Sequence, residues 1–440
     1  MTAFLGIPYA TAERFGGPQP LAWDGLVPGA FGPSAPQRRS GPLVEAVPGM
    51  RVGETHEDCL TLNVWAPSGA TGLPVMVWIH GGAYVIGGSS LLTYDGARLS
   101  EQGEVVVVSL NYRLGALANL LVGDAANRGL LDQVAALQWV RDNIAAFGGD
   151  PARVTVFGES AGAGGILHLL GAPVADGLFR RAILQSPGAE VIHRPAAEAL
   201  AAAFTAPLDA PFEDLLDAQE AAAQQVAHLF GSMPWAPVVD GTVVPVAPQE
   251  RIAAGELAGV DVLVGTTSAE LALFTGDLPV HVAPKVLRHL LTPVLGRDPG
   301  SEACERLVAS YGGDATQALS DAVLGVPALR LTDALARHHP ATFAYRFAWD
   351  GGRFGACHAA DLPFTFGTLD VDGWAAFVGA DDEARRLSDD MIRSWSSFAR
   401  SGDPGWPAYD PDARTTMVLG RSTAVTEHPL AARLRLHEEV

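Results

Sequence analysis

A serine at the centre of a short glycine-rich pattern could carry nucleophilic chemistry. Ser160 lies in the run Gly158-Glu159-Ser160-Ala161-Gly162, between a segment typical of a strand (154–157) and one typical of a helix (161–170). A strand-to-helix turn this sharp strains the central residue, exposes its hydroxyl and places it at the positive end of the helix. A serine that only capped an ordinary helix would not need small residues on both sides. We therefore predict that Ser160 is a catalytic nucleophile.

A second glycine-rich segment, Ile79-His80-Gly81-Gly82-Ala83-Tyr84, directly follows another predicted strand. Acyl transfer needs two or three backbone N–H groups aimed at the oxygen that becomes negative, and small residues let the backbone come close to it. We predict an oxyanion hole formed by the amides of Gly82 and Ala83, with the amide of Ala161 as the third donor. A glycine-rich turn without a role is the alternative, and it is weaker in a chain that also carries the serine turn.

Among the twelve histidines of the chain, His358 is the predicted general base. It lies in the loop 355–364, after a predicted strand that ends near Trp349. A histidine in a late loop can reach a serine, and its side chain titrates near neutral pH as a general base should. The other histidines after Ser160 stand mostly in helical or terminal segments, where a solvated side chain is the usual interpretation: His168, His193, His228, His281, His289, His338, His339, His428 and His437.

The acid that would orient this histidine is predicted at Glu270, in the loop after the predicted strand 262–265. Catalytic groups collect where parallel strands end, at the carboxyl edge of an open sheet. Position alone leaves Asp240, Asp261 and Asp361 as competing candidates. Asp240 stands in a Val-Val-Asp-Gly turn, and Asp361 is very close in sequence to His358.

These residues need a scaffold that brings distant loops together, and the apolar pattern of the chain predicts one. The apolar runs typical of buried strands are 75–79, 105–110, 154–157, 182–185, 262–265 and 342–349. The segments with helical character are 130–146, 213–229 and 381–400. Such alternation predicts an α/β fold with a mostly parallel central sheet and helices on both of its faces.

One domain over residues 1–440 fits this pattern better than two, because neither a repeat nor a low-complexity linker interrupts it. The stretch from about 190 to 340 holds more helix than strand. We predict that it contains cap-like or regulatory helical insertions over the active site, and that its loops form the acyl and alcohol pockets.

Composition narrows the classes of partner and compartment. The formal charge is −20, which disfavours nucleic acid, anionic membrane surfaces and polyanionic substrates. Three cysteines without a Cys-x-x-Cys pair predict neither a disulfide framework nor a metal site. The sequence shows no signal-peptide pattern and no apolar run of about 18 residues, so we expect a cytoplasmic protein. Lys285, the only lysine, lies far from Ser160 and excludes a Ser-x-x-Lys dyad.

Taken together, the motifs resemble the type-B carboxylesterases, the cholinesterase-like branch of the α/β-hydrolase superfamily, and among them the bacterial p-nitrobenzyl-esterase-like enzymes. The matching segments are Phe4-Leu5-Gly6-Ile7-Pro8-Tyr9-Ala10, Arg14-Phe15, Glu57-Asp58-Cys59-Leu60-Thr61-Leu62-Asn63-Val64, Asn111-Tyr112-Arg113-Leu114-Gly115, Gly129-Leu130-Leu131-Asp132-Gln133, and the runs 147–162 and 395–404. They extend over nearly the whole chain. The resemblance implies the α/β-hydrolase fold and a Ser-Glu-His catalytic triad.

On the positions of this sequence, the implied triad is Ser160, Glu270 and His358. The resemblance also implies supporting roles for Gly81, for Glu159 beside the nucleophile, and for Ser186 as a hydrogen-bonding partner on the acid's side. The same comparison implies two structural ion pairs, which join Arg14 to Glu57 and Arg113 to Asp132.

The sequence also departs from the family's pattern. Cys59 matches a cysteine that the family usually commits to a disulfide, but the next cysteine is Cys304, so we expect a free buried thiol. The family's first strands are expected to be missing or trimmed, because the chain begins at the Phe-Leu-Gly-Ile-Pro motif. The segment between Cys59 and the oxyanion loop is too short for the loop that carries the choline-binding tryptophan, so choline esters are not supported.

The predicted reaction is hydrolysis of a small neutral carboxylic ester by water, through an acyl-enzyme and without a cofactor or metal. The same triad would serve an amidase, a carbamate hydrolase or a thioester hydrolase, and the sequence does not separate these. A non-catalytic binding module is a rival of another class, disfavoured because all three triad positions are filled. The natural substrate and the oligomeric state stay open.

Overall fold

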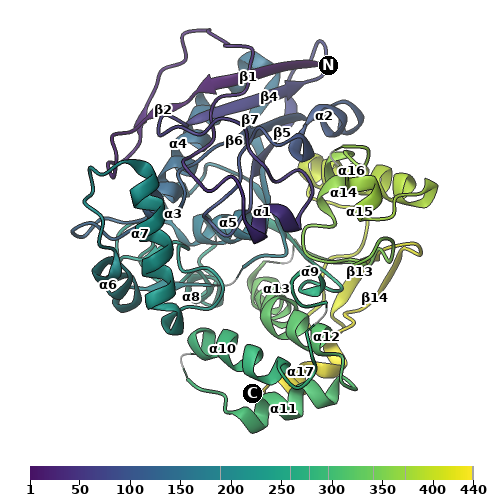
Figure 1. Ribbon diagram of the computed structural model, residues 1–440. Helices are drawn as coiled ribbons and strands as arrows, with labels where there is room; N and C mark the ends of the chain where they lie inside the picture. The colour runs from purple at the N-terminus through teal and green to yellow at the C-terminus, as the bar shows by residue number, and fades with distance from the viewer. Residues whose placement is uncertain are drawn as a thin grey trace.

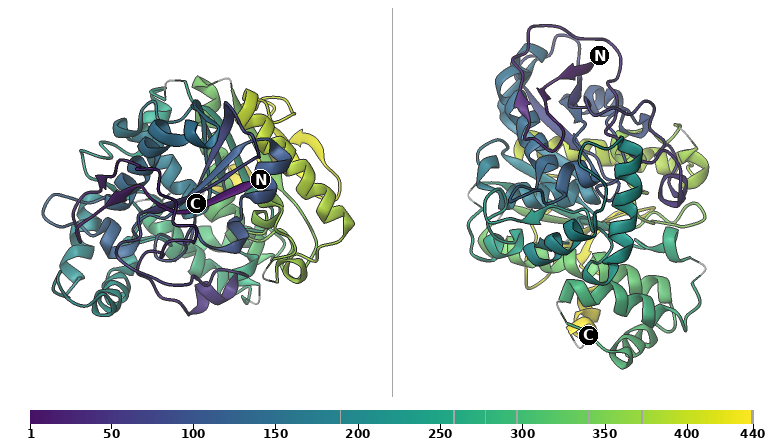
Figure 2. Two further views of the ribbon diagram at one scale, coloured as in Figure 1. Left: turned by 90° about the horizontal axis from the view of Figure 1, so that it is seen from above. Right: turned by 60° about the vertical axis from the view of Figure 1, so that its left-hand side comes forward.

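The computed structural model describes residues 1–438 except positions 189, 258, 277, 296, 340 and 372. A ten-stranded sheet runs through this part of the chain, with helices on both faces (Figures 1 and 2). The order of its strands is β1 (Thr2–Pro8), β4 (Thr61–Ala66), β6 (Val106–Leu110), β5 (Leu73–Ile79), β7 (Gly149–Glu159), β8 (Arg181–Gln185), β11 (Asp261–Thr267), β12 (Thr342–Phe347), β13 (Thr415–Leu419) and β14 (Ala424–Glu427). Two short pairs stand apart: β2 (Ala10–Thr11) with β3 (Gln19–Pro20), and β9 (Ile192–His193) with β10 (Val238–Val239).

From β6 to β13 each neighbouring pair of the sheet is parallel, and only the outer strands β1, β4 and β14 pair antiparallel. The central strands are apolar and buried over most of their length, as expected for strands covered on both faces. The predicted mostly parallel sheet is confirmed. Because parallel strands share a direction, the loops after β5, β7, β8, β11 and β12 meet at one edge of the sheet.

The predicted strand 342–349 ends earlier, at Phe347. Trp349 leaves the ladder because its indole turns to other partners. Its Nε1 donates to the carbonyl of Val378 at 2.7 Å, and the guanidinium of Arg421 stacks 4.2 Å from its ring. The chain therefore bends away from the sheet two residues before the position that the apolar pattern indicated.

Helices cover the two faces of the sheet and form separate cores with it. One face carries α3 (Gly115–Asn119), α4 (Arg128–Asn143), α5 (Ala161–Gly171), α6 (Arg194–Ala203), α7 (Phe212–Gln225), α8 (Pro248–Ala253) and α13 (Val326–His338). The other face carries α2 (Ala97–Gly103), α14 (Leu362–Phe366), α15 (Trp374–Phe377) and α16 (Asp382–Ser401). In Figure 1, α3 to α8 lie mostly on the left of the strands, and α2 and α14 to α16 lie on the right.

The three helices predicted from the sequence are present with shifted ends. The segment 130–146 forms α4 and continues as the 3-10 turn η2 (Ile144–Phe147), and 213–229 forms α7 followed by η4 (Ala227–Leu229). The late helix is α16, and Asp381 caps it by accepting hydrogen bonds from two first-turn amides. The other single-turn elements are α1 (Pro42–Ala46), η1 (Leu92–Tyr94), η3 (Pro173–Ala175) and η6 (Ala431–Arg433).

A smaller helical group lies beyond the sheet, at the end of the molecule where Figure 1 places the C-terminus. It consists of α9 (Ala272–Thr275), α10 (Ala283–Leu295), α11 (Ser301–Ser310), α12 (Ala315–Ser320), the π-helix η5 (Asp321–Gly325) and α17 (Leu434–Glu438). Helices α10 to α12 share a small core of their own. The stretch 190–340 is thus largely helical around the single long strand β11, and its interpretation as a cap within one domain stays a prediction.

Two ion pairs, one buried and one half-buried, connect the sequence motifs named above. The guanidinium of Arg113 binds Asp132 with Nε at 2.8 Å and a terminal nitrogen at 2.7 Å, and both side chains are buried. Arg14 pairs with Glu57, with Nε 2.8 Å from a carboxylate oxygen. Both predicted ion pairs are therefore present. Cys59 is a free, buried thiol as expected, and burial raises the pKa of that thiol.

In the described residues, none of the helices combines the length and the apolar composition that crossing a membrane requires.

Candidate active site

Ser160 is the single residue between β7, which ends at Glu159, and α5, which begins at Ala161. Its backbone has φ 57° and ψ −124°, a region that residues with a side chain rarely adopt. The neighbouring strand holds this conformation, because the amide of Ser160 donates to the carbonyl of Gln185 at 3.0 Å. The predicted sharp turn is present, and it carries local strain at the serine.

The glycines on either side are required by the closeness of β5. A Cβ on Gly162 would stand 2.1 Å from the carbonyl oxygen of Ile79, and one on Gly158 would stand 2.7 Å from the same atom. Any side chain at either position would push the turn away from β5. The Gly-x-Ser-x-Gly spacing is therefore a packing requirement of the turn that presents Ser160.

The loop after β5 lies directly against the serine. A Cβ on Gly81 would stand 3.2 Å from Cβ of Ser160. Tyr112 fixes the position of this loop, because its hydroxyl donates to the carbonyl of His80 at 2.7 Å. Gly82 and Ala83 both have positive φ, 112° and 53°. Within the described residues, the amides of Gly82 and Ala83 donate to no protein acceptor. Two free N–H groups therefore belong to the segment predicted to bind an oxyanion.

His358 follows β12 in the chain and lies beside the loop after β11. Its Nδ1 is 2.7 Å from Oε2 of Glu270, and its amide donates to the carbonyl of Glu270 at 3.0 Å. The other carboxylate oxygen of Glu270 accepts from Ser186 Oγ at 2.6 Å and from the amide of Thr267 at 2.7 Å. Burial alone would raise the pKa of Glu270, but these hydrogen bonds hold it below its ordinary value. Glu270 is therefore an ionised carboxylate that fixes one nitrogen of His358.

The second nitrogen of His358 has a partner that the sequence did not indicate. Its Nε2 is 3.1 Å from Oε1 of Glu159, the buried residue before the nucleophile. Burial disfavours the charged imidazole, yet Glu159 and Glu270 on its two sides raise the pKa of His358 to about 9. Burial raises the pKa of Glu159 to about 8. Nε2 thus faces Glu159 in this structure, where a direct Ser160–His358 relay was predicted.

The competing carboxylates have other partners. Asp361 is buried and accepts from Gln185 Nε2 at 2.8 Å and from the Tyr345 hydroxyl at 3.2 Å. Asp240 accepts from two amides of its own turn, and Asp261 pairs with Arg181 at 3.3 Å. Of the four carboxylates weighed from sequence position, Glu270 is the one in contact with His358.

A cavity of about 410 Å³ opens over these residues at the carboxyl edge of the sheet. Ser160, His358, Glu159, Gly82 and Ala83 line it together with Leu43, Val47, Met50, Ile86, Tyr94, Gly188, Glu190, Ser232, Met233, Leu271, Phe274, Thr275, Val286, Leu290, Val323, Leu324, Ala359 and Leu362. Part of the wall comes from the stretch 190–340, and the assignment of its loops to the acyl and alcohol pockets stays a prediction. The α1 region and Tyr94 were not predicted, and the only signal for them is the apolar run Leu43-Val44 in a proline-started turn.

The π-helix η5 forms one side of this cavity and is braced by the carboxyl-terminal segment. Val323 and Leu324 of η5 line the cavity. Leu430 packs against the outer side of η5 so closely that a Cβ on Gly325 would stand 2.7 Å from its Cδ1. Asp321, at the start of η5, pairs with Arg346 of β12 at 3.3 Å.

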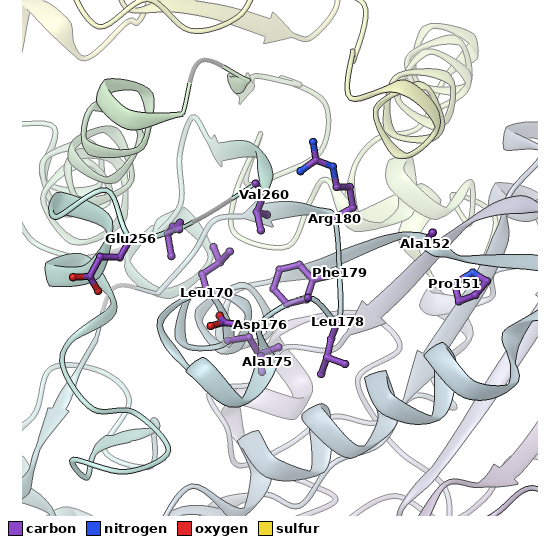
Figure 3. A pocket seen from close by; sticks show the side chains of 14 residues that line it. Pro151, Ala152, Leu170, Ala175, Asp176, Leu178, Phe179, Arg180, Glu256 and Val260 are labelled. Carbon is purple, nitrogen blue, oxygen red and sulfur yellow. The ribbon is translucent and has the colours of Figure 1, made fainter.

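A second cavity, of about 400 Å³, lies at the opposite edge of the sheet, where β7, β8 and β11 begin (Figure 3). The side chains of Leu170, Leu178 and Phe179 lie together there, with Arg180 and Glu256 farther out (Figure 3). Among its described lining residues there is no serine, cysteine or histidine. Across the described part of the chain, no group of three or more histidine, cysteine or acidic side chains is placed to hold a metal ion.

Comparison with known proteins shows the family of this chain. A family model described as the carboxylesterase family matches residues 1–436. The para-nitrobenzyl esterase of Bacillus subtilis strain 168 is 36% identical, over 96% of this chain and 92% of that protein. Carboxylesterase 3 of Homo sapiens is 33% identical, over 93% of this chain and 81% of that protein.

Solved structures give the same result. A PNB esterase aligns with a TM-score of 0.88 at 35% identity, covering 99% of this chain and 95% of the other. A thermophilic PNB esterase aligns with a TM-score of 0.86 at 34% identity, with the same coverage. The fold, the matched family and these relatives lead to one conclusion: the chain belongs to the carboxylesterase family and is a carboxylic-ester hydrolase with the α/β-hydrolase fold.

Proposed function

We propose that this enzyme hydrolyses carboxylic esters in two acyl-transfer steps, with Ser160 as nucleophile, His358 as general base and Glu270 as the acid that orients the base. The observation that carries the proposal is the 2.7 Å contact between His358 Nδ1 and Glu270, beside a strained serine in the same cavity. A nucleophile, a base and a group that fixes the base are the parts that acyl transfer needs.

In the first step His358 Nε2 takes the proton of Ser160 as Oγ attacks the ester carbonyl. To do so, Nε2 must first leave Oε1 of Glu159, which is 3.1 Å away. Catalytic hydrogen bonds often form only once substrate is bound. Glu270 keeps its hold on Nδ1 and stabilises the imidazolium that results.

The negative charge that develops on the carbonyl oxygen is stabilised by backbone amides. Gly82 and Ala83 supply two N–H groups that have no protein acceptor among the described residues. Ala161 supplies a third, since the first amide of α5 has no partner within its helix. The imidazolium of His358 then gives its proton to the departing alcohol, and a water activated by the same histidine releases the acid.

The substrate is proposed to be an ester without a negative charge, since the chain has a formal charge of −20. We also propose that the enzyme is cytoplasmic, because its three cysteines are buried and free. Amides, carbamates and thioesters could use the same triad. Rates on matched ester, amide and thioester substrates, with the same acyl group, decide between these reactions.

Labelling with a fluorophosphonate, followed by peptide mapping, tests the assignment of the nucleophile. We expect the label on the peptide that contains Ser160 and no label after substitution by alanine. Modification of another residue, with Ser160 unlabelled, would refute the proposed site.

A further inference from the structure

The active-site cavity carries one carboxylate that the proposed mechanism does not use. The charged or titrating side chains among its lining residues are Glu159, His358 and Glu190, besides the phenol of Tyr94. Glu159 and His358 contact each other, which leaves Glu190. No arginine or lysine is among the described residues that line this cavity. Within this lining, Glu190 therefore has no arginine or lysine beside it, while Arg330 and His193 line the adjoining cavity that Glu190 also borders.

Among the described residues, the side chain of Glu190 has one hydrogen-bond donor. Its Oε1 accepts from Ser232 Oγ at 2.5 Å. Its Oε2 lies beside Gly188, 2.9 Å from where a Cβ on that glycine would stand. A carboxylate has about four lone-pair sites, so one hydroxyl leaves several free. Within the described residues, Glu190 forms no ion pair with an arginine, lysine or histidine.

Glu190 stands at the end of the cavity where it meets two others. It also lines a narrow space of about 20 Å³, which shares Ser232, Leu290 and Val323 with the active-site cavity. Beyond that constriction it lines a further cavity of about 490 Å³. A group bound to Glu190 would therefore belong to the far end of a substrate, away from the ester bond at Ser160.

A half-buried carboxylate among apolar side chains attracts a cation more strongly than a fully solvated one does, because less water screens the pair. The net charge of −20 adds a long-range attraction for cations and a repulsion for anions. An ammonium group with N–H donors can also fill the free lone pairs of Glu190. A quaternary ammonium cannot, and it depends on aromatic faces, of which the described lining offers Tyr94 and Phe274.

We propose that Glu190 determines substrate specificity by binding a primary or secondary ammonium group at the end of the ester remote from the scissile bond. The inference rests on the proposed function, because the ester must be held at Ser160 in the same cavity. The substrate class is thus an amino-substituted ester whose apolar spacer fills the region between Ser160 and Glu190.

Three matched p-nitrophenyl esters test whether Glu190 binds an ammonium group. They are the ω-aminohexanoate, the neutral heptanoate of nearly equal length, and the monoester of adipate, which ends in a carboxylate. A second set, aminohexyl and heptyl benzoates, places the same charge on the alcohol side. The variants are Glu190→Gln, which keeps shape and removes charge, and Glu198→Gln, which removes an equal charge from the exposed face of α6. The measured quantity is kcat/KM at low ionic strength.

In one of the two sets, we expect wild type to prefer the ammonium ester over its neutral partner. If that is the p-nitrophenyl set, the adipate monoester should be hydrolysed more slowly than the heptanoate. Glu190→Gln should lower kcat/KM for the ammonium ester about tenfold while the neutral ester changes less than twofold. Glu198→Gln should leave both unchanged. Equal losses in both variants would assign the preference to long-range attraction and overturn the role of Glu190, as would the absence of any preference in both sets. Wild type that hydrolyses none of the esters would overturn the proposed function itself.

Discussion

Two cavities of nearly equal volume border the same three strands, one at each edge of the sheet. The cavity at the carboxyl edge encloses about 410 Å³ and contains Ser160, His358 and Glu159. The cavity at the amino edge encloses about 400 Å³ and is lined by aliphatic, aromatic and charged side chains, without a serine, cysteine or histidine among its described residues. The residues that follow β7, β8 and β11 line the first cavity, and the start of β7, the segments before β8 and β11 and the last turn of α5 line the second.

The two cavities differ in their lining residues because the parallel strands all end at the same edge of the sheet. At the carboxyl edge the strands lead into loops, and a loop can present a side chain or a free amide at the end of a rigid strand. The positive end of α5 also points there, because α5 begins at Ala161. The amino edge receives the last turn of α5 instead, near Leu170. Volume alone therefore does not identify the site.

The sharpest test of this contrast is Ser160→Ala against a polar substitution at the other edge, Asp176→Asn. The alanine variant lacks the nucleophile, so we expect kcat/KM on short p-nitrophenyl esters to fall by about 10⁴-fold or more. Asp176→Asn should stay within twofold of wild type. A comparable loss in the Asp176 variant would mean that the amino-edge cavity takes part in the reaction.

Glu270→Gln should have the next largest effect. Glutamine keeps the size of the side chain but loses the charge that holds Nδ1 of His358 and stabilises its protonated form, so we expect kcat to fall by about 10²- to 10⁴-fold. The thermal midpoint of unfolding should be recorded alongside, since Ser186 and Thr267 also bind this carboxylate. A folded variant with nearly full kcat would remove Glu270 from the triad.

Glu159→Gln should change the pH dependence more than the maximal rate. His358 acts as a base only when it is neutral, and Glu159 helps to raise the pKa of His358 to about 9. Without that carboxylate the pKa of His358 falls, so the acidic limb of the kcat/KM profile should move to lower pH. At a pH well below the pKa, the neutral fraction of His358 rises about tenfold when the pKa is lowered by about one. A limb that stays in place, or moves to higher pH, would contradict the contact between Glu159 and His358.

Phe179→Ala should have the smallest effect on activity and a clear effect on stability. Phe179 is a buried side chain at the amino-edge cavity, and its removal enlarges that cavity at a cost of about 3 kcal/mol in the free energy of unfolding. We expect kcat/KM within twofold of wild type and a lower midpoint in urea. A variant with lost activity and unchanged stability would indicate that the amino-edge cavity, too, contributes to catalysis.

The parts of the site that sequence could predict are those defined by local structure. The turn at Ser160 is local, because a strand, a small-residue pattern and a helix follow one another within a few positions. The geometry of this turn also depends on the close packing of β5, which the two flanking glycines indicate. The alternation of apolar runs predicted the sheet for the same reason, with the end of β12 misplaced because Trp349 binds partners far away in the chain.

Contacts between residues far apart in the sequence were harder to predict. His358 and Glu270 are 88 positions apart, and position alone left several carboxylates open until the family resemblance selected one. The contact of His358 with Glu159 depends on the orientation of an imidazole ring, for which a sequence pattern carries no signal. The α1 wall of the cavity depends on how a short turn packs across the molecule, and its few apolar residues resemble many other loops.

The π-helix that borders the cavity makes the substrate space sensitive to chain length as well as to residue identity. A π-turn contains one more residue than the corresponding α-turn, so deleting one residue from η5 would restore α-helical spacing and rotate the residues before it by about 100° relative to α13. Val323 and Leu324 could not then both keep their places. Homologous enzymes could therefore acquire different substrate ranges through insertion or deletion of a single codon here, with the nucleophile and its relay untouched.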